Sequence, residues 1–490
     1  MTFSIECNNF LKSLHLLNHF IQIGANNVLL CPGSRSAPLV LAANEFNKKG
    51  LINIYNSIDE RSGAFHALGI SAASGNITLV ITTSGTAVAN LLPCAVEADK
   101  SNIPLVFITA DRPYRLKDCG ANQTVNQEEF LQSVCRLNLN SCKNGIHKTH
   151  DKDIKNYISS IYKQYITQPG PCHLNIPFEE PLKISKDNQK KIIEFFLKSQ
   201  DKKTLELSKK EYLLSNNKES FEVSQILDFK MDGIIIVGPY RGLAKDLNGY
   251  NLALQKLQNY TGWPVFADPV SGVSSRLKGV VENWEFIIET KNIPDYFSQI
   301  LRIGPLSSSK HLENFLKDFK GVQLLIKNKE FRNLDPLKKS YEASISLVDF
   351  VDNIFTEKSN EILSKRKLTK LAEDLISKGT KIKKVIRKNL RYDQKITEIG
   401  LANFLPEVWP ANYPIMLSAS SPIRDWLTFS GNNLFSRRCF SFRGASGIDG
   451  TLSSALGIAR VINPLLLVTG DLAFLHDING WLIEKSKELK

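Results

Sequence analysis

Short apolar runs alternate with helical patterns through the first third of the chain. Each run is rich in β-branched residues and is followed by turn residues or by apolar positions at a helical spacing. The runs lie at 28–31, 52–55, 78–82, 104–109 and 172–176, and helices are expected at 9–23, before Gly24, and from Ala37. This alternation is typical of a parallel sheet wrapped by helices, and the continuous apolar character predicts strands buried on both faces.

The same pattern returns in two further blocks. Apolar runs begin near 233, 264, 301 and 322 in the second block, and near 414 and 464 in the third. Two lysine-rich, polar stretches separate the blocks, and we expect a linker and a helical connector there. The sequence therefore predicts an α/β fold of three consecutive parallel-sheet domains, the third incomplete. The expected limits are 1–182, 183–222 (linker), 223–355, 356–400 (connector) and 401–490.

Composition places the chain among ordinary globular proteins. Its 490 residues are 42% hydrophobic and 23% charged, and the net charge is +13. A basic protein can bind nucleic acid, an anionic membrane surface or small anionic substrates. The lysines are spread widely and no basic stretch is interleaved with aromatic residues, so we expect a solvated surface and no nucleic-acid partner. Steeply salt-dependent retention on DNA would support the nucleic-acid alternative.

Cysteine usage and the N-terminus indicate a cellular compartment. The eight cysteines form no C-x-x-C pair, so neither a zinc site nor a thioredoxin-like site is expected; they stand at 7, 31, 94, 119, 135, 142, 172 and 439. Buried reduced thiols in a cytosolic protein explain them best. The N-terminus is typical of an amphipathic helix rather than a signal peptide, and no stretch is long enough to span a bilayer. We expect a soluble, cytoplasmic protein without membrane insertion.

Polar residues after three predicted strands suggest a ligand site. Open α/β sheets bind ligands at the carboxyl ends of their strands. The turn at 31–36 leads from strand to helix and carries Arg35, which can bind a carboxylate through two nitrogens, although an ordinary turn with a surface arginine has the same pattern. Asp59 and Glu60 can equally complement a helix dipole, and Arg112 can be structural. The small residues at 82–87 most simply indicate close packing.

Taken together, these segments resemble the family of SEPHCHC synthases, which are thiamine-diphosphate-dependent enzymes; SEPHCHC is 2-succinyl-5-enolpyruvyl-6-hydroxy-3-cyclohexene-1-carboxylate. The resemblance covers nearly the whole chain, and GANQ with RGASGIDG is its most specific combination. It rests on CPGSRSAPL, SIDERSGAFHALG, TTSGTAVANLLPCAVEA, PLVFITADRPYRLKDCGANQ, GPCHLNIPFEEPL, RIGPLSSSK, SASSPIRD, FRGASGIDGTLSSALGIA and LLLVTGDLAFLHDING. The resemblance implies a pyrimidine-binding domain at 1–182, a middle domain at 223–355 and a diphosphate-binding domain at 401–490.

The resemblance also implies a reaction. It would be the decarboxylating transfer from 2-oxoglutarate to isochorismate in menaquinone or phylloquinone biosynthesis, with thiamine diphosphate and Mg²⁺ or Mn²⁺. Glu60 matches the glutamate that activates the cofactor. A buried carboxyl with a raised pKa can share a proton with the aminopyrimidine ring nitrogen, which leads to deprotonation of the thiazolium C2. The family places the cofactor between subunits, so a homodimer or homotetramer is expected.

The resemblance assigns roles to further residues. Both substrates carry two carboxylates, so their site needs fixed cations with a forked geometry. The matched catalytic residues are Glu60, Arg35, Arg112, Gln123, Ser420, Arg424 and Arg443, and the matched substrate-binding residues are Ser34, Asn122 and Lys310. The matched cofactor residues are Glu60, Thr83, Gly85, Ile448 (an apolar wedge that bends the cofactor), Gly470 and Asp471, and Asp471 also matches the metal ligand. The family often has arginine where this chain has His311, which puts one charge contact in doubt.

Two other interpretations stay open. The sequence stops before the family's asparagine-rich turn, which supplies more metal ligands, so a C-terminally truncated, non-catalytic remnant is one alternative. The other is a carboligase of the acetolactate-synthase kind, whose members often bind flavin in the middle domain. The segment GIIIVGPYRGLAKD lacks a G-x-G-x-x-G turn, so flavin is not expected, and the arginine-rich site exceeds what pyruvate needs.

Overall fold

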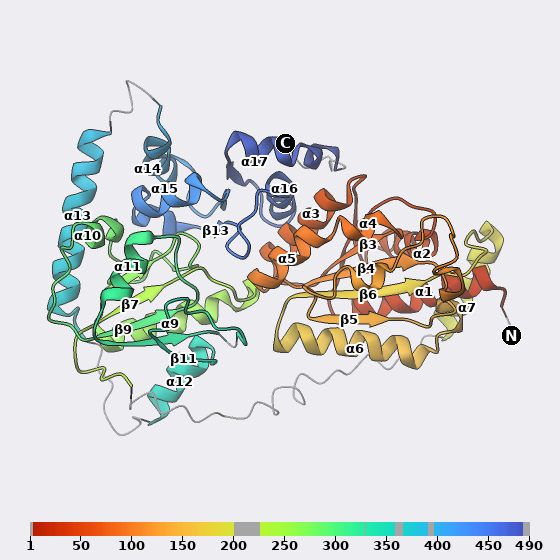
Figure 1. Cartoon of the computed structure of the whole chain (residues 1–490), viewed down its shortest axis with the longest axis horizontal. Helices are drawn as coiled ribbons and strands as arrows, with labels where there is room; N and C mark the ends of the chain where they lie inside the picture. Colours follow the sequence, from red (N-terminus) through yellow and green to blue (C-terminus); the bar gives the residue numbers. More distant parts are fainter. Residues whose placement is uncertain (1–2, 200–225, 329, 358–365, 391–395, 484–490) are drawn as a thin grey trace. The chain divides into compact units, whose positions relative to one another are not determined.

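Three sheets, each built of parallel strands, form the chain (Figure 1). The computed structural model describes residues 3–199, 226–328, 330–357, 366–390 and 396–483. Contacts divide the chain into two compact units, which are described separately. The first comprises Met1–Asn217, Phe442–Ile462 and Asp471–Lys490, and the second comprises Lys218–Ser441 and Asn463–Gly470.

The first unit contains a six-stranded sheet in the order β2-β1-β3-β4-β6-β5. Its strands are β1 (Asn27–Leu30), β2 (Asn53–Asn56), β3 (Thr78–Thr82), β4 (Leu105–Asp111), β5 (Leu137–Asn140) and β6 (Pro171–Pro177). Every residue of β3, β4 and β6 is buried, as their apolar runs predict. Because all six strands are parallel, their carboxyl ends lie along one edge of the sheet.

Helices cover both faces of this sheet, and Figure 1 shows α6 along one face with α3 and α5 along the other. The N-terminal helix α1 packs against α2, α6 and α7. The α-helices are α1 (Ile5–Gln22), α2 (Ala37–Lys48), α3 (Glu60–Ser74), α4 (Thr86–Ala89), α5 (Leu92–Ser101), α6 (Asp151–Thr167) and α7 (Lys186–Ser199). Short 3₁₀ turns lie at η1 (Tyr114–Leu116), η2 (Gln127–Glu129) and η3 (Ile146–Lys148).

The last part of the chain also contributes to the first unit. It supplies α16 (Thr451–Ala459), α17 (Asp471–His476) and η7 (Ile478–Leu482), and α16 packs closely against α3. Two glycines make this approach possible. A Cβ on Gly69 would overlap the carbonyl of Ser454, and a Cβ on Gly457 would overlap the carbonyl of His66. The two helices therefore meet backbone to backbone.

The second unit contains a five-stranded sheet, ordered β11-β10-β9-β7-β8, and a three-stranded sheet, ordered β13-β12-β14. The strands are β7 (Gly233–Val237), β8 (Val265–Ala267), β9 (Gln299–Ile303), β10 (Val322–Ile326), β11 (Tyr341–Ala343), β12 (Ile415–Leu417), β13 (Cys439–Phe440) and β14 (Leu466–Val468). Alternate residues of β7 enter two cores on opposite faces: Ile235 and Val237 join one, and Ile234 and Ile236 the other.

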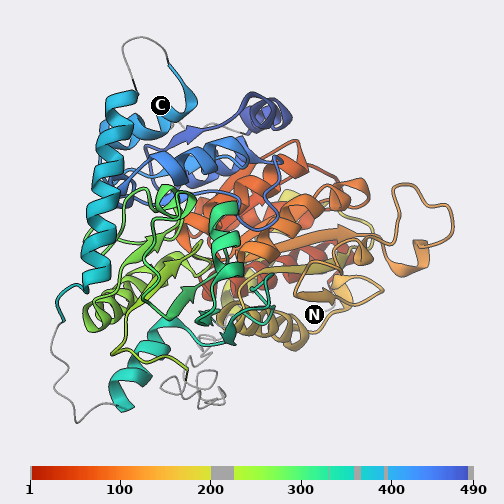
Figure 2. The ribbon, with the colours of Figure 1, turned by 60° about the vertical axis from the view of Figure 1, so that its left-hand side comes forward.

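Helices and 3₁₀ turns complete the second unit. They are η5 (Ala244–Asp246), α9 (Leu247–Thr261), α10 (Trp284–Glu289), α11 (Lys310–Asp318), α12 (Leu347–Glu357), α13 (Lys370–Asn389), α14 (Glu398–Val408), α15 (Ser421–Phe429) and η6 (Asn432–Ser436). Figure 2 shows α13 as the long cyan helix, which packs against α10. None of the helices in the described residues is long and apolar enough to cross a membrane.

The predicted fold class is confirmed, and the errors fall at sheet edges. Strands β5, β11 and β13 were not predicted, and each is short and lies at an edge. Strands β5 and β11 have mixed polarity, and β13 is only two residues long, so none gives an apolar run. The three sheets lie within 1–182, 223–355 and 401–490, although the domain limits themselves stay a prediction. The expected linker contains α7 and the expected connector contains α13; residues 200–225, 358–365 and 391–395 lie outside the described residues.

Candidate active site

Turns after β1 and β3 meet at the carboxyl edge of the six-stranded sheet. A Cβ on Gly33, in the first turn, would overlap the side chain of Thr83 in the second. Gly85 follows with φ +86°, a conformation that favours glycine, and its N–H donates to the Gln127 side-chain oxygen at 2.9 Å. The small residues of these turns therefore allow close approach at the place where such sheets bind ligands.

Arg35 is held in place by the segment that follows β6. The arginine is only 6% exposed, and its Nη1 donates to the Phe178 carbonyl at 2.9 Å while its Nη2 donates to Glu180 Oε1 at 2.8 Å. Ser34, the residue before it, is exposed. The turn after β1 thus presents a guanidinium that is held in place, and its proposed role stays a prediction.

Arg112 lies near Arg35 and contacts the turn after β3. Its Nη1 donates to the Ser84 hydroxyl. Burial and the neighbouring charge of Arg35 lower the pKa of Arg112, while Asp111 and Glu180 act in the opposite direction. Two guanidiniums close enough to repel each other form a cationic pair that suits an anionic ligand.

The loop after Arg112 brings a third predicted segment to this edge. Gln123, at φ +54°, donates from Nε2 to the Ser84 carbonyl at 2.9 Å, and the preceding Asn122 is exposed. The structure therefore brings Arg35, Arg112 and Gln123 together around the turn after β3, the turn that holds Thr83 and Gly85.

A buried polar network that sequence reasoning missed lies beneath this turn. Gln127 is fully buried, and its Nε2 donates to the Ala110 carbonyl at 3.1 Å and to Asn175 Oδ1 at 2.9 Å. Asn175 donates in turn to Asp111 Oδ2 at 2.9 Å, and Lys117 pairs with the same oxygen at 3.0 Å. The missed signal was a run of polar residues directly after GANQ, because local periodicity does not show that they are buried.

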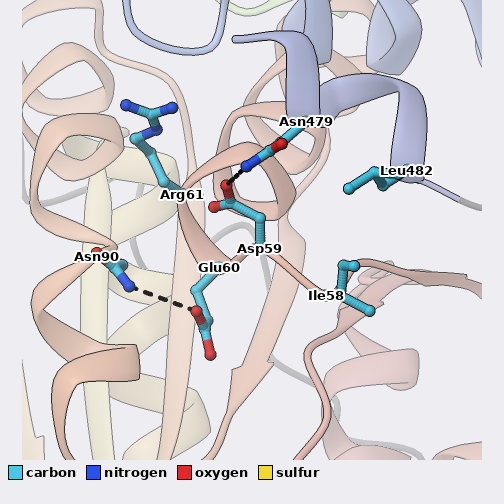
Figure 3. A pocket seen from close by; sticks show the side chains of 7 residues that line it. All are labelled: Ile58, Asp59, Glu60, Arg61, Asn90, Asn479 and Leu482. Carbon is cyan, nitrogen blue, oxygen red and sulfur yellow. Dashed lines mark hydrogen bonds between the residues drawn. The ribbon is translucent and has the colours of Figure 1, made fainter. Parts of the chain in front are cut away.

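Glu60 begins α3 and lines a pocket of about 410 Å³ (Figure 3). Asp59 precedes it as the N-cap and accepts from the Ser62 amide at 3.1 Å, which fixes where the helix starts. Asn90, missed from sequence, donates to Glu60 Oε2 at 3.4 Å. The pocket is lined by Ile58, Asp59, Glu60, Arg61, Asn90, Asn479 and Leu482.

The Glu60 carboxyl faces the pocket, and its burial against a cofactor stays a prediction. Its side chain is intermediate in exposure, because it points into the pocket rather than into the protein core. Cys31, at the end of β1, still lies close enough for the negative charges of Glu60 and Asp59 to add to the effect of burial and raise the pKa of its thiol. Glu60 and Arg35 therefore follow the adjacent strands β2 and β1, while Arg112 follows β4 of the same sheet.

The other wall of the pocket comes from the end of the described chain. Asn479 donates to Asp59 Oδ2 at 2.8 Å, and Arg61 Nη2 donates to the His476 carbonyl at 2.8 Å. Ser62 donates to Asp477 Oδ1 at 2.9 Å, and burial raises the pKa of this carboxyl. The start of α3 thus holds a segment more than 400 residues away in sequence.

Ile448 and Arg443 lie on the loop that enters α16. Phe442 opens this loop and its ring packs on Phe65 of α3, with ring centroids 5.5 Å apart. At the other end Gly450 has φ +66°, and a Cβ there would overlap the Phe65 ring. Ile448 is 37% exposed between these two anchors, so its side chain is available to a ligand.

Three predicted residues form separate features of the second unit. Ser420 follows β12 with φ +74°, a strained conformation for serine, and accepts from Arg424 Nη2 at 3.2 Å. Lys310 begins α11, is exposed and pairs with Glu313 at 2.9 Å. His311, next to it, stands 3.9 Å from Glu289.

The pocket residues fit a cofactor that carries ring nitrogens and an amine, because a carboxylate and an amide face the same space. A metal has less support. Asp471 is exposed and accepts from the Leu472 amide at 2.8 Å, and a Cβ on Gly470 would meet open space. Within the described residues no three His, Cys, Asp or Glu side chains are grouped as metal ligands. One carboxylate does not satisfy Mg²⁺, which takes six oxygen ligands.

Comparison with known proteins decides the family. The family "Thiamine pyrophosphate enzyme, N-terminal TPP binding domain" matches residues 15–133. A 2-succinyl-5-enolpyruvyl-6-hydroxy-3-cyclohexene-1-carboxylate synthase of Prochlorococcus marinus (strain MIT 9301) is 58% identical over 489 residues, which span all of this chain and 83% of that protein. A protein of the same name from strain NATL2A is 45% identical over 499 residues, which span all of this chain and 82% of that protein.

The chain belongs to the SEPHCHC synthase family. SEPHCHC synthases are transferases that use thiamine pyrophosphate, and the three parallel sheets of this chain agree with the α/β fold of that enzyme class. The matched domain contains the strands β1 to β4, and so it contains Arg35, Glu60, Gly85 and Arg112.

Proposed function

We propose that this chain joins 2-oxoglutarate to isochorismate with loss of CO₂ and so forms SEPHCHC in menaquinone or phylloquinone biosynthesis. The observation that carries the proposal is the arginine pair at the carboxyl edge of the sheet that also leads to Glu60. Arg35 follows β1, the neighbour of the strand β2 that precedes Glu60, and Arg112 follows β4 of the same sheet. A dicarboxylate needs such fixed cations, and the names of the relatives specify the product.

Thiamine diphosphate is the proposed cofactor, and when bound it supplies an electron sink for decarboxylation. Glu60 would exchange a proton with a ring nitrogen of the cofactor, and Asn90 would orient the carboxyl through its hydrogen bond. Thr83, Gly85 and Ile448 would contact the cofactor. We further propose that Gly470 and Asp471 meet the diphosphate and Mg²⁺ or Mn²⁺, although no step is assigned to the metal.

Substrate carboxylates would bind the arginines and the neutral donors around them. Arg35, Arg112 and Gln123 already surround one turn, and Ser34 and Asn122 are exposed beside them. The remaining proposed contacts are Lys310, Ser420, Arg424 and Arg443. This chain has His311 where the family often has arginine, so the site would lack one permanently charged guanidinium.

The assembly is proposed to be a homodimer or homotetramer in the cytoplasm. Large apolar side chains are exposed in the first unit close to the pocket wall, including Leu472 at 70% and Leu475 at 59%. Free cysteines agree with a reducing compartment. The proposal includes the three domains at 1–182, 223–355 and 401–490 and no nucleic-acid partner. Light scattering that finds only monomer would contradict the assembly.

A product assay tests the proposed function. Purified chain with thiamine diphosphate and Mg²⁺ is given isochorismate with either 2-oxoglutarate or pyruvate, and CO₂ and the adduct are measured. We expect turnover with 2-oxoglutarate, and a loss of at least about tenfold in kcat/KM for Arg35→Ala but not for Arg115→Ala, whose exposed arginine pairs with Glu179. Turnover of pyruvate instead would favour an acetolactate-synthase-type enzyme.

No turnover, together with no thermal shift at saturating cofactor, would favour a non-catalytic protein, because a ligand that binds only the native state must raise its stability.

A further inference from the structure

Glu97 is a buried acid that the proposed chemistry does not use. It lies in α5, and its side chain is only 3% exposed. Glutamate is almost never buried so completely unless its carboxylate is paired or hydrogen-bonded. The partners of this carboxylate therefore indicate what the residue does.

Four uncharged donors surround the Glu97 carboxylate, and three are consecutive backbone amides. The N–H groups of Gly444, Ala445 and Ser446 donate at 2.9, 2.7 and 3.2 Å. The Ser101 hydroxyl donates at 2.7 Å. Successive amides that converge on one anion form a nest, and here the anion is a side chain of the same unit.

This contact dictates the local sequence of the loop. A Cβ on Gly444 would lie 2.7 Å from Ser101 Oγ and 2.8 Å from Glu97 Oε1, so only glycine fits beside the carboxylate. Ser446 adopts φ +58°, which a non-glycine residue takes only at a cost. Its hydroxyl also donates to the Phe442 carbonyl at 3.1 Å. The carboxylate thus holds a strained loop in one conformation.

The loop held in this way carries two residues of the proposed site. Arg443 directly precedes the three donors, and Ile448 follows them by two residues. We propose that Glu97 is a positioning residue: its carboxylate fixes the amides of 444–446 and thereby aims Arg443 at the carboxylate of the substrate. This inference rests on the proposed function.

The first test replaces Glu97 by glutamine, which has the same shape. One of its two oxygens becomes an NH₂ group, which cannot accept from the amides of Ala445 and Ser446. We expect KM for the anionic substrate to rise about tenfold while kcat changes less than about threefold, because a binding group is misplaced. Glu45→Gln is the matched control, since Glu45 forms a surface pair with Lys48, and it should change neither constant.

A double-mutant cycle separates positioning from simple support of the fold. If Glu97 acts through Arg443, Glu97→Gln should raise KM less than about twofold in an Arg443→Ala background, because residues that act together are not additive. Equal effects of Glu97→Gln in both backgrounds would overturn the proposal. Glu97→Asp, which keeps both acceptor oxygens, should recover part of the lost affinity; a KM as high as that of Glu97→Gln would count against the proposal.

Amide hydrogen exchange gives a readout that needs no turnover. In the unchanged protein the amides of 444–446 should exchange slowly, and in Glu97→Gln at least about tenfold faster, with the amides of β4 unaffected. Equal exchange at 444–446 in the two proteins would overturn the anchoring. If the unchanged protein turned over no substrate, the proposed function would fail while the exchange experiment still tested the contact.

Discussion

At the scale of single residues, the proposed site depends on buried polar side chains as well as on the arginines at the carboxyl edge of the sheet. Arg35 and Arg112 could be placed at the carboxyl edge of the sheet from sequence, because each follows an apolar strand run, but their proposed role came from the family resemblance. Glu97 and Gln127 could not, because each contacts groups that only the tertiary fold brings near. A helical polar residue gives no local sign that it is buried.

Gln127→Glu should make substrate affinity depend on pH. The new carboxylate would face two acceptors, the Ala110 carbonyl and Asn175 Oδ1, without a proton to donate to either. Protonation of the carboxylate at lower pH would restore one hydrogen-bond donor. We expect KM for 2-oxoglutarate to be about tenfold above the unchanged protein at pH 8, with the ratio of the two KM values falling towards pH 5.

Steady-state kinetics across pH 5–8 measure this ratio. The control is Gln132→Glu, whose exposed side chain donates to the Glu128 carbonyl at 3.4 Å. A KM ratio that stays constant across this range would show that the hydrogen bonds of Gln127 do not position the turn after β3.

At the scale of elements, the contact between α3 and α16 places the proposed site residues. Glu60 is the first residue of α3, and Ile448 precedes α16 by three residues. The sequence indicates a helix start near Asp59 but predicts neither α16 nor its contact with α3, because Gly69 and Gly457 matter only once the two backbones meet. Small residues in a helix also fit ordinary packing, so their pattern alone does not choose a partner.

Gly457→Ala should destabilise the protein. Alanine favours a helix over glycine by about 1 kcal/mol, but its Cβ would overlap the His66 carbonyl, and a backbone group cannot move aside as a side chain can. Overpacking of this kind costs about 1–3 kcal/mol, so we expect a net loss of stability. Urea unfolding measures it.

Gly249→Ala is the opposite control within α9, where the nearest atom to an added Cβ is 4.0 Å away. That substitution should leave stability unchanged or raise it by up to about 1 kcal/mol. A Gly457→Ala protein as stable as the unchanged one would contradict the close contact between α3 and α16.

At the scale of the whole molecule, the fold class followed from sequence and the division into units did not. Apolar runs specify strands locally, so three parallel sheets could be predicted. Residues 442–462 and 471–490 nevertheless group with the first unit, while 463–470 group with the second. Hydrophobic periodicity predicts that a segment is buried, but it does not predict which part of the protein the segment packs against.

The free energy of unfolding should decrease in mild acid, because His66 is buried in its neutral form. Burial, and then the charge of Arg460, lower the pKa of this histidine to about 3 from an ordinary 6.5. The unfolded chain therefore binds a proton before the folded one does. The contribution of neutral His66 to the free energy of unfolding is fully present above pH 6.5. It is lost as pH falls towards 3, by up to about 1.4 kcal/mol per pH unit.

The variant His66→Phe tests this acid response. It removes the titrating group while keeping a ring beside Tyr55. Its unfolding free energy in urea should fall less steeply between pH 6.5 and 4.5 than that of the unchanged protein. Identical slopes would mean that His66 is not buried in its neutral form.

We propose that Glu60 activates thiamine diphosphate in the pocket at the start of α3. The most direct measurement is the rate at which the C2 proton of the bound cofactor exchanges with solvent, followed by NMR for the unchanged protein and for Glu60→Gln. We expect the C2 proton to exchange about 10²–10⁴-fold more slowly in the variant, because a positioned acid or base usually contributes a factor of this size. Equal exchange rates, with the cofactor bound equally well, would contradict it.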